Sequence, residues 1–153
     1  MKFMGIPIDG DVNSFCEMLQ ERGFVKDENA PDSMYSYVGK FYGEDAYINV
    51  EYDPYTHVTC SVSVSFVHKI SLSLITLQRN ILKAIEEKYT YKKQLVNQEL
   101  RQYDYYIFDA LDPIGLIQTF LIEMDPPKES MLSISYTDVE NYLKMENRKS
   151  EDL

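Results

Sequence analysis

The sequence predicts a single α+β domain, residues 1–153, with a mainly antiparallel sheet and two helices packed on one of its faces. Three observations lead to this prediction. Two segments place apolar residues at helical spacing, several others alternate apolar and polar residues, and most alternating segments follow one another after short turns. Such runs of strands favour antiparallel pairing, whereas a helix after every strand would favour a parallel sheet. The expected order is β-α-β-β-β-α-β-β-β-β, followed by a C-terminal tail or short helix.

The composition limits the class of protein. The chain has 25 acidic and 15 basic residues, a formal charge of −10 at pH 7, which repels nucleic-acid phosphates and anionic lipid surfaces. Nucleic acid is therefore not an expected partner. Because no run of about 18 apolar residues is present, we expect no transmembrane segment. Pro7 and Asp9 stand where a signal peptide needs an apolar core, so we expect no signal peptide in this chain, although an envelope or secreted location stays open for a mature fragment.

The N-terminal part predicts a strand and a helix. The segment "KFMGIPI" is typical of a short strand, and after it Val12, Phe15 and Leu19 recur at three- and four-residue spacing, which indicates one apolar helix face. Gly23 is suited to the left-handed conformation that ends many helices, and Phe24 can pack back onto the last turn. A loop over residues 26–33 is expected to follow.

Three strands are expected next. Residues 34–42 and 46–52 predict a hairpin joined by "GED", and Asp53 followed by Pro54 favours a second turn. Residues 58–68 show the clearest alternation, which predicts a sheet with one buried face and one hydrated, hydroxyl-rich face. The expected buried positions are Val58, Cys60, Val62, Val64 and Phe66, and the expected hydrated ones are Thr59, Ser61, Ser63 and Ser65.

The second half predicts a helix and four strands. Residues 71–89 carry an apolar stripe at helical spacing, and we expect this helix to cover the sheet. Pro113, Pro126 and Pro127 are expected to interrupt pairing between the later strands. The tail from about residue 140 predicts a short helix with a frayed end. The four strands are expected at 94–100, 103–110, 115–124 and 131–138.

The stretch "PIDGDVNSF" raises the question of a calcium site, because Asp9, Asp11 and Asn13 carry oxygen atoms at alternate positions. A calcium loop of the helix-loop-helix type needs Gly at its sixth position and a bidentate Glu at its twelfth. With Asp9 as the first position, these are Ser14 and Gln20, so both demanding positions fail. We interpret Asp11 instead as a helix cap that accepts hydrogen bonds from the first helical turn. No metal or cofactor is therefore expected.

Motifs for catalysis are also absent from the sequence, which has no "GxSxG" elbow and no phosphate-binding glycine loop. Cys16 and Cys60 lie at expected core positions without basic neighbours, which favours two buried thiols, although a disulfide between them stays open. His57 and His68 flank an expected strand and lie too far apart along it to share a metal, so we expect surface positions. We predict no catalytic residues, and an enzyme is the less favoured class.

The thirteen tyrosines are the feature of the composition with most functional potential. An amphipathic ring in a strand or turn can serve an interface. The alternative is that these rings only cover the edges of the sheet, because tyrosine is also a favourable strand residue. The interface candidates are Tyr52, Tyr55, Tyr103, Tyr105 and Tyr106.

The opening strand, the "GIPIDG" turn, the helix that ends in "GF" and the segment "SYTDVEN" at residues 135–141 resemble short, uncharacterised bacterial α+β proteins. The resemblance covers both ends and the order of elements across most of the chain. It implies no activity, because none is known for that group, and no functional residue is carried over. Many of its members look secreted or envelope-associated, and this chain departs from them in showing no leader.

Three functional hypotheses remain. The leading one is a non-enzymatic binding or protein-interaction module whose partner is an unknown protein or small ligand. It would bind through an aromatic patch or through the hydroxyl-rich sheet face. This hypothesis predicts no deep polar pocket. The second is an enzyme with a dispersed active site, which requires a concave site holding a titratable residue with a strongly shifted pKa. The third is an acidic inhibitor or immunity-type partner that masks a basic surface, whose binding would weaken steeply with added salt.

Overall fold

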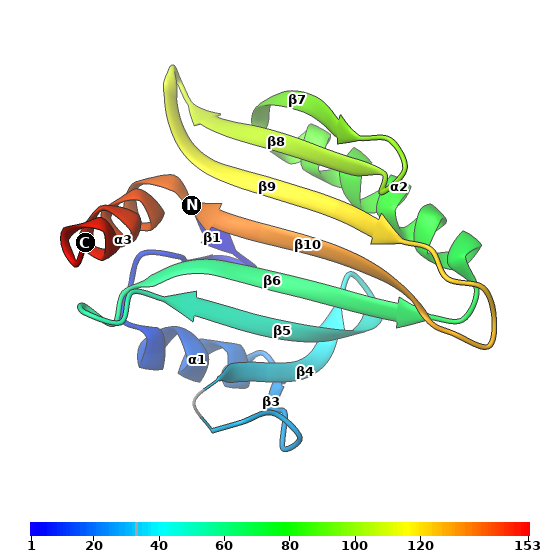
Figure 1. Ribbon diagram of the computed structural model, residues 1–153, viewed down its shortest axis with the longest axis horizontal. Helices are drawn as coiled ribbons and strands as arrows, with labels where there is room; N and C mark the ends of the chain where they lie inside the picture. The colour runs from blue at the N-terminus through cyan, green and yellow to red at the C-terminus, as the bar shows by residue number, and fades with distance from the viewer. Residues whose placement is uncertain (33) are drawn as a thin grey trace.

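A computed structural model describes residues 1–32 and 34–153, so Ser33, at the end of the expected loop, lies outside the described residues. The fold is α+β, with a hairpin of two short strands and an antiparallel sheet of eight strands in the order β3-β4-β5-β6-β10-β9-β8-β7 (Figure 1). The predicted fold class is therefore confirmed. The elements are β1 (Lys2–Phe3), β2 (Ile6–Pro7), α1 (Val12–Glu21), β3 (Val25–Lys26), β4 (Tyr35–Phe41), β5 (Glu44–Tyr52), β6 (Thr59–His68), α2 (Ser71–Lys88), β7 (Thr90–Asn97), β8 (Gln102–Asp109), β9 (Asp112–Ile122), β10 (Ser130–Asp138) and α3 (Val139–Glu151).

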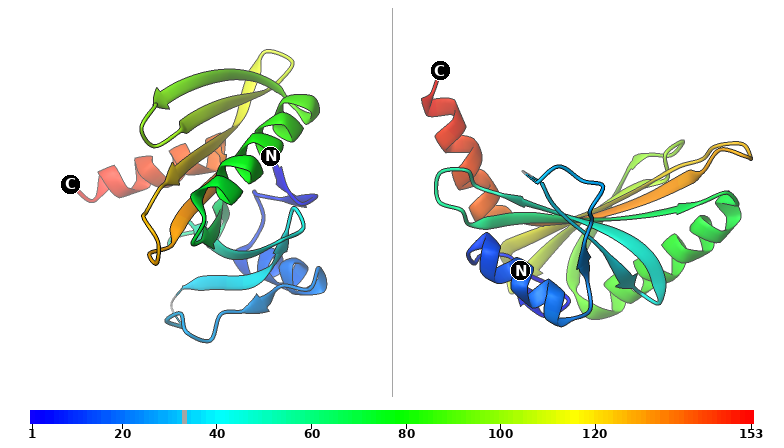
Figure 2. Two further views of the ribbon diagram at one scale, coloured as in Figure 1. Left: turned by 90° about the vertical axis from the view of Figure 1, so that its right-hand side faces the viewer. Right: turned by 90° about the horizontal axis from the view of Figure 1, so that it is seen from below.

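The large sheet consists of two halves with the same chain order. In each half a helix precedes four consecutive antiparallel strands: α1 precedes β3 to β6, and α2 precedes β7 to β10. The last strands of the halves, β6 and β10, pair at the centre of the sheet, with Val64 opposite Ile134. The helices α1 and α2 lie on one face, as predicted, and α3 extends from the other face (Figure 2). Within the described ranges, no helix combines the length and apolar character needed to cross a membrane.

The hydrophobic core lies between the sheet and the layer formed by α1 and α2. Val62, Val64 and Phe66 of β6 are buried, as their alternation predicts, and share one cluster with Leu19 of α1 and Ile81 of α2. Burying an apolar side chain of this size contributes about 1.5–3 kcal/mol. One continuous core therefore stabilises both halves of the sheet.

The N-terminal segment forms a hairpin of two strands, β1 and β2, and not the single strand that the sequence predicts. Met4 and Gly5 turn the chain with φ angles of 50° and 79°. This left-handed conformation is unusual for a residue with a Cβ atom. The apolar run hid the turn because only one of the two turn residues is glycine.

The helix α1 begins and ends where the sequence predicts. The Asp11 side chain accepts hydrogen bonds from the N–H groups of Asn13 at 3.0 Å and Ser14 at 3.2 Å. At the other end Gly23 has a φ of 91°, and the N–H of Phe24 bonds back into the last turn at 3.1 Å. The interpretation of Asp11 as a helix cap is therefore confirmed.

Strand boundaries differ from the prediction at several places, among them β7, which begins at Thr90 and not at residue 94. Val25–Lys26 forms the additional strand β3, which is too short to show a period. Tyr42 and Gly43 form the turn between β4 and β5, so Glu44 begins a strand and does not belong to the connection. Pro113 lies inside β9 and does not end it, because the pairing with β8 shifts register beside it. A bulge tolerates proline since the ladder is already interrupted there.

The C-terminal residues form α3, a helix of 13 residues, in the region where the sequence predicts a tail or a short helix with a frayed end. Asp138 caps this helix by accepting a hydrogen bond from the N–H of Asn141 at 3.1 Å, and it also binds the amino group of Met1 at 3.3 Å. Met145 is buried against Cys60, with their sulfur atoms 3.7 Å apart. The sequence does not reveal the full length of this helix, because Met145 is its single buried residue and no apolar stripe results.

Candidate functional site

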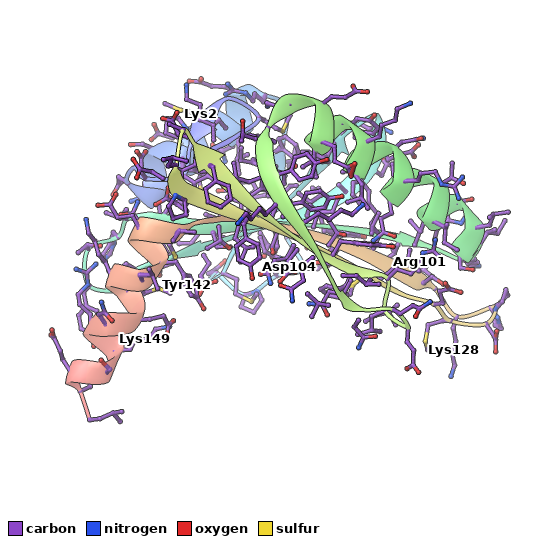
Figure 3. All side chains as sticks on the ribbon, turned by 90° about the horizontal axis from the view of Figure 1, so that it is seen from above. Lys2, Arg101, Asp104, Lys128, Tyr142 and Lys149 are labelled. Atoms are coloured by element: carbon purple, nitrogen blue, oxygen red, sulfur yellow. The ribbon has the colours of Figure 1, made fainter. Side chains whose placement is uncertain are left out.

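A row of polar side chains crosses the sheet on the face opposite α1 and α2. Its members lie directly opposite one another on successive strands, so they share one face. At one end Ser36 donates a hydrogen bond to Asn49 at 2.5 Å, and towards the other Gln118 donates to the Asp104 carboxylate at 3.4 Å. Figure 3 shows Asp104 on the side of the sheet that carries α3. From β4 to β7 the row is Ser36, Asn49, Ser63, Ser135, Gln118, Asp104 and Gln94.

A groove with a volume of about 800 Å³ lies over this row and is bounded on one side by α3. Ser61, Ser63 and Ser135 line it from the sheet, and Tyr142 and Leu143 line it from α3. Figure 3 labels Tyr142 on this helix. The volume falls within the range of about 300–1,000 Å³ that is usual for ligand pockets. The face that the alternation predicts to be hydrated is therefore hollowed, and of its four predicted residues Ser63 and Ser65 are half-buried, whereas Thr59 and Ser61 are buried.

The centre of the row is open to a ligand. Ser63 of β6 lies opposite Ser135 of β10, at the middle of the sheet. Neither hydroxyl makes a hydrogen bond with another described side chain, whereas the side chains towards both ends of the row bond to each other. A hydroxyl can both donate and accept a hydrogen bond. The floor can therefore bind either kind of polar group on a ligand.

The turn between β5 and β6 holds α3 in place and so sets the width of the groove. Asp53 in this turn is 1% exposed, and its carboxylate accepts a hydrogen bond from Arg148 of α3. Tyr55 in the same turn donates to Asp152 just after the helix. Burial alone would raise the pKa of Asp53, but hydrogen bonds from the Tyr55 N–H and from Arg148 lower it on balance. Asp53 therefore remains a charged anchor for α3 at neutral pH.

The described residues that line the groove contribute negative charge and no positive charge. Its lining includes the carboxylate of Glu51 and, among the described residues, no Lys, Arg or His. Tyr35 also lines it, and burial, followed by the influence of Tyr52, raises the pKa of Tyr35. The Tyr35 hydroxyl, which donates to Asn13 at 3.3 Å, therefore stays protonated at neutral pH. This lining suits a ligand that is neutral or positively charged.

Two of the five predicted interface tyrosines line this groove. Tyr52 lines it from β5 and Tyr106 from β8, although they are far apart in the sequence. Tyr55 lies outside the groove and supports it through the hydrogen bond to Asp152. Tyr106 lies on the groove face of the sheet, whereas Tyr52 packs against the hydrophobic core and against the ring of Tyr35 at the margin of the groove.

The other two tyrosines lie on the α2 side of the sheet. Tyr103 stacks beneath Lys93, whose ammonium nitrogen is 4.8 Å from the ring centroid. Tyr105 is fully buried and donates a hydrogen bond to Glu86 at 2.7 Å. Desolvation and this bond raise the pKa of Tyr105. Tyr105 is therefore a core residue without a surface for a partner.

The remaining candidate groups do not gather into one centre. Asp11 is occupied as a helix cap, and the part of the chain that the structure describes contains no cluster of His, Cys, Asp or Glu that could hold a metal ion. His57 and His68 are exposed near opposite ends of β6. Cys16 and Cys60 are buried and free, which confirms the prediction of two buried thiols. Burial raises the pKa of Cys60 to about 12, so this thiol is no nucleophile at neutral pH.

Several groove residues were not predicted from the sequence. Asn49 and Gln118 each follow an isoleucine inside a strand, and a polar residue at such a position is a signal that could have marked the second face of the sheet. Tyr142 carries no comparable signal, because it belongs to the helix that was expected to fray.

Compared with protein-family models, curated proteins and solved structures, the chain has no match in any of the three.

Proposed function

We propose that this protein is a binding module that holds an extended segment of a partner protein in the groove between the hydroxyl-rich sheet face and α3. The observation that carries the proposal is the open pair Ser63 and Ser135 beneath a margin of Tyr106, Tyr142 and Leu143. Hydroxyls at the floor can bond to backbone amides, and aromatic and aliphatic margins can pack on side chains. A peptide offers both kinds of group at regular spacing.

The shape of the groove favours a segment of a protein over an enclosed small molecule. Leu143 is 55% exposed and Tyr106 is 40% exposed, so the groove is open between its two margins. Small-molecule sites usually bury most of the ligand surface. An open groove with apolar margins instead suits a chain that continues beyond the site.

The charge of the site predicts the charge of the partner segment. The lining contains Glu51 without a described cation, and the whole chain has a formal charge of −10. Like charges repel at an interface, and complementary charges accelerate encounter. We therefore propose that the segment is neutral or basic and carries apolar side chains.

An enzymatic role receives less support. A dispersed active site would need a titratable group in the groove that can exchange protons near neutral pH. The raised pKa of Tyr35 moves that hydroxyl further from neutrality. The thiol of Cys60 is buried against Met145, and its raised pKa keeps it protonated.

The test is a selection of random peptides on the immobilised protein, followed by titration of the enriched peptides. We expect enriched peptides to combine apolar residues with Lys or Arg. Ser63→Trp fills the groove floor and should weaken binding at least about tenfold, a loss of roughly 1.4 kcal/mol. The matched control is Ser65→Trp, on the same strand and face but outside the groove lining.

Two outcomes would contradict the proposal. Peptides that bind both tryptophan variants as they bind the wild type would place the contact outside the groove. Selection of acidic peptides would contradict the charge argument. Steep weakening of binding with added NaCl would favour an acidic inhibitor or immunity-type partner, because long-range attraction is screened by salt whereas close contacts in the groove are screened less.

A further inference from the structure

A second depression, with a volume of about 300 Å³, lies on the α2 side of the sheet, on the face opposite the groove. It is formed by α2, by β7 and β8 and by the turn between these strands. The lining includes the cations Arg79, Lys83, Lys93 and Arg101 and one carboxylate, Glu86. In a chain with a formal charge of −10, this is a local excess of positive charge.

Three of these cations have no carboxylate partner within the described ranges. Lys93 pairs with Glu86 at 3.3 Å, but no ion pair forms between Arg79, Lys83 or Arg101 and a described carboxylate. Arg79 and Lys83 are four residues apart on α2, a spacing at which like charges destabilise a helix. The helix therefore keeps two cations together at a cost to its own stability.

The backbone of Arg101 is held in an unfavourable conformation. Its φ is 45°, in the left-handed region that residues with a Cβ atom rarely adopt. Gln78 of α2, which is 2% exposed, fixes this turn by donating hydrogen bonds to the Arg101 carbonyl at 2.8 Å and to the Thr119 hydroxyl at 3.1 Å. Strain that the surroundings maintain in this way is concentrated at functional sites.

The guanidinium of Arg101 also lacks an acceptor. Its Nε is buried and has no hydrogen-bond partner among the described residues. Arg148 has a similar buried Nε, but its Nη2 is paired with Asp53, whereas Arg101 has no such carboxylate. An unpaired buried donor is costly, and oxyanion oxygens are the acceptors that a guanidinium binds best.

We propose that this depression binds a phosphate group, held by Arg101, Arg79 and Lys83. A guanidinium binds phosphate through two parallel hydrogen bonds. A phosphate ester carries nearly two negative charges at neutral pH, which matches three unpaired cations better than the single charge of a carboxylate does. Since the depression is small, the ligand is free phosphate or a small phosphate monoester. The site is independent of the groove and of its proposed partner.

The experiment is calorimetric titration of the full chain with inorganic phosphate, glycerol 3-phosphate and acetate, with NaCl adjusted to hold the ionic strength constant. We expect saturable one-to-one binding of phosphate or the monoester, and acetate binding at least about tenfold weaker. The affinities for inorganic phosphate and for glycerol 3-phosphate show whether the site prefers free phosphate or a monoester. The Nε–H resonance of Arg101 in a nitrogen-15 spectrum should move during the same titration.

Two variants test the assigned residues. Arg101→Gly removes the guanidinium and relaxes the left-handed backbone, so the fold should be retained while phosphate binding falls at least about tenfold. Lys83→Gln, at an exposed position of α2, should weaken binding several-fold, whereas the matched Lys69→Gln outside the depression should not.

The proposal would be overturned if phosphate gave the same heat as chloride. It would also be overturned if Arg101→Gly bound phosphate as tightly as the wild type. If Arg101→Gly fails to fold, the comparison of Lys83→Gln with Lys69→Gln tests the site instead. Equal affinity of these two variants for phosphate would then contradict the proposed site. Equal binding of acetate and phosphate would contradict the assignment to phosphate.

Discussion

The guanidinium of Arg148 donates a hydrogen bond to the buried carboxylate of Asp53, a residue 95 positions earlier in the chain. This pair joins α3 to the turn between β5 and β6. Together with the contact of Met145 with Cys60, it fixes the helix that forms one wall of the groove. The geometry of the groove therefore depends on a small set of contacts between α3 and the end of the sheet, among which the ion pair of Arg148 with Asp53 carries the charge.

Arg148→Met should destabilise the protein because it leaves the buried Asp53 carboxylate without its cationic partner. We expect a loss of about 1–3 kcal/mol in the free energy of unfolding, measured by urea denaturation at pH 7. The control is Lys149→Met, which removes an exposed ion pair with Glu146 and should cost less than about 1 kcal/mol. Equal losses in the two variants would show that Asp53 does not need Arg148.

The same pair predicts a dependence of stability on acid. The pKa of Asp53 is lower in the folded protein than its ordinary value, so this group stabilises the fold above that value, roughly pH 4, and loses the effect as the pH falls through the folded pKa. Asp53→Asn should therefore be less stable than the wild type at pH 7, and the difference should shrink below about pH 4. Urea denaturation at pH 7 and below pH 4 measures the difference in the free energy of unfolding between the two proteins. A difference that grows in acid would contradict the predicted direction of the pH dependence.

Gly39→Ala should destabilise the sheet because there is no space for a Cβ atom on β4. An added Cβ would lie 2.5 Å from Cδ1 of Phe24, a buried ring. Overpacking of this kind costs about 1–3 kcal/mol. Gly10→Ala is the matched control, since nothing lies within 4 Å of a Cβ there. Thermal unfolding of both variants checks the prediction, which fails if Gly39→Ala is as stable as Gly10→Ala.

Asp11→Ala should lower stability by about 1 kcal/mol, because it removes the hydrogen bonds to the N–H groups of Asn13 and Ser14. Asp9→Ala, at an exposed position before the helix, should have little effect. Adding calcium should not raise the melting temperature of the wild type. A calcium-dependent increase that both substitutions abolish would restore the metal-site interpretation.

The two thiols should be unreactive in the folded protein. Cys16 and Cys60 are buried, and burial raises the pKa of both, to about 12 for Cys60. We expect a thiol reagent such as a disulfide dye to label neither residue at pH 8 and to label both in urea. Rapid labelling of the folded protein at Cys60 would show that α3 detaches from the sheet.

The fold could be predicted from the sequence wherever a residue pattern repeats. The alternation in β6 and the apolar stripe of α2 were sufficient for those elements, since each extends over many residues. Three features escaped: the first hairpin, where Met4 occupies a position expected for glycine, the two-residue strand β3, and the start of β7 at Thr90. All eight residues of β7 are exposed, so hydrophobic alternation could not mark its beginning.

The groove could be predicted only in part. The serines of β6 indicated a hydrated face, but their neighbours across the sheet depend on strand order and register. Cys60 illustrates the limit. The alternation assigned it to the main core, whereas the register shift between β5 and β6 leaves it unpaired and in contact with Met145 of α3. A bulge changes which face a side chain occupies, and it leaves no trace in composition.

The pairing of β6 with β10 has a consequence for how the chain reaches this structure during synthesis. Ser61 lies opposite Thr137, so the two halves of the sheet can join only after β10 has left the ribosome. Until then β6 presents a bare hydrogen-bonding edge with Val62, Val64 and Phe66 beside it, which is a template for aggregation. Contacts between such distant segments form slowly, so the nascent chain depends on folding faster than it meets another copy of itself.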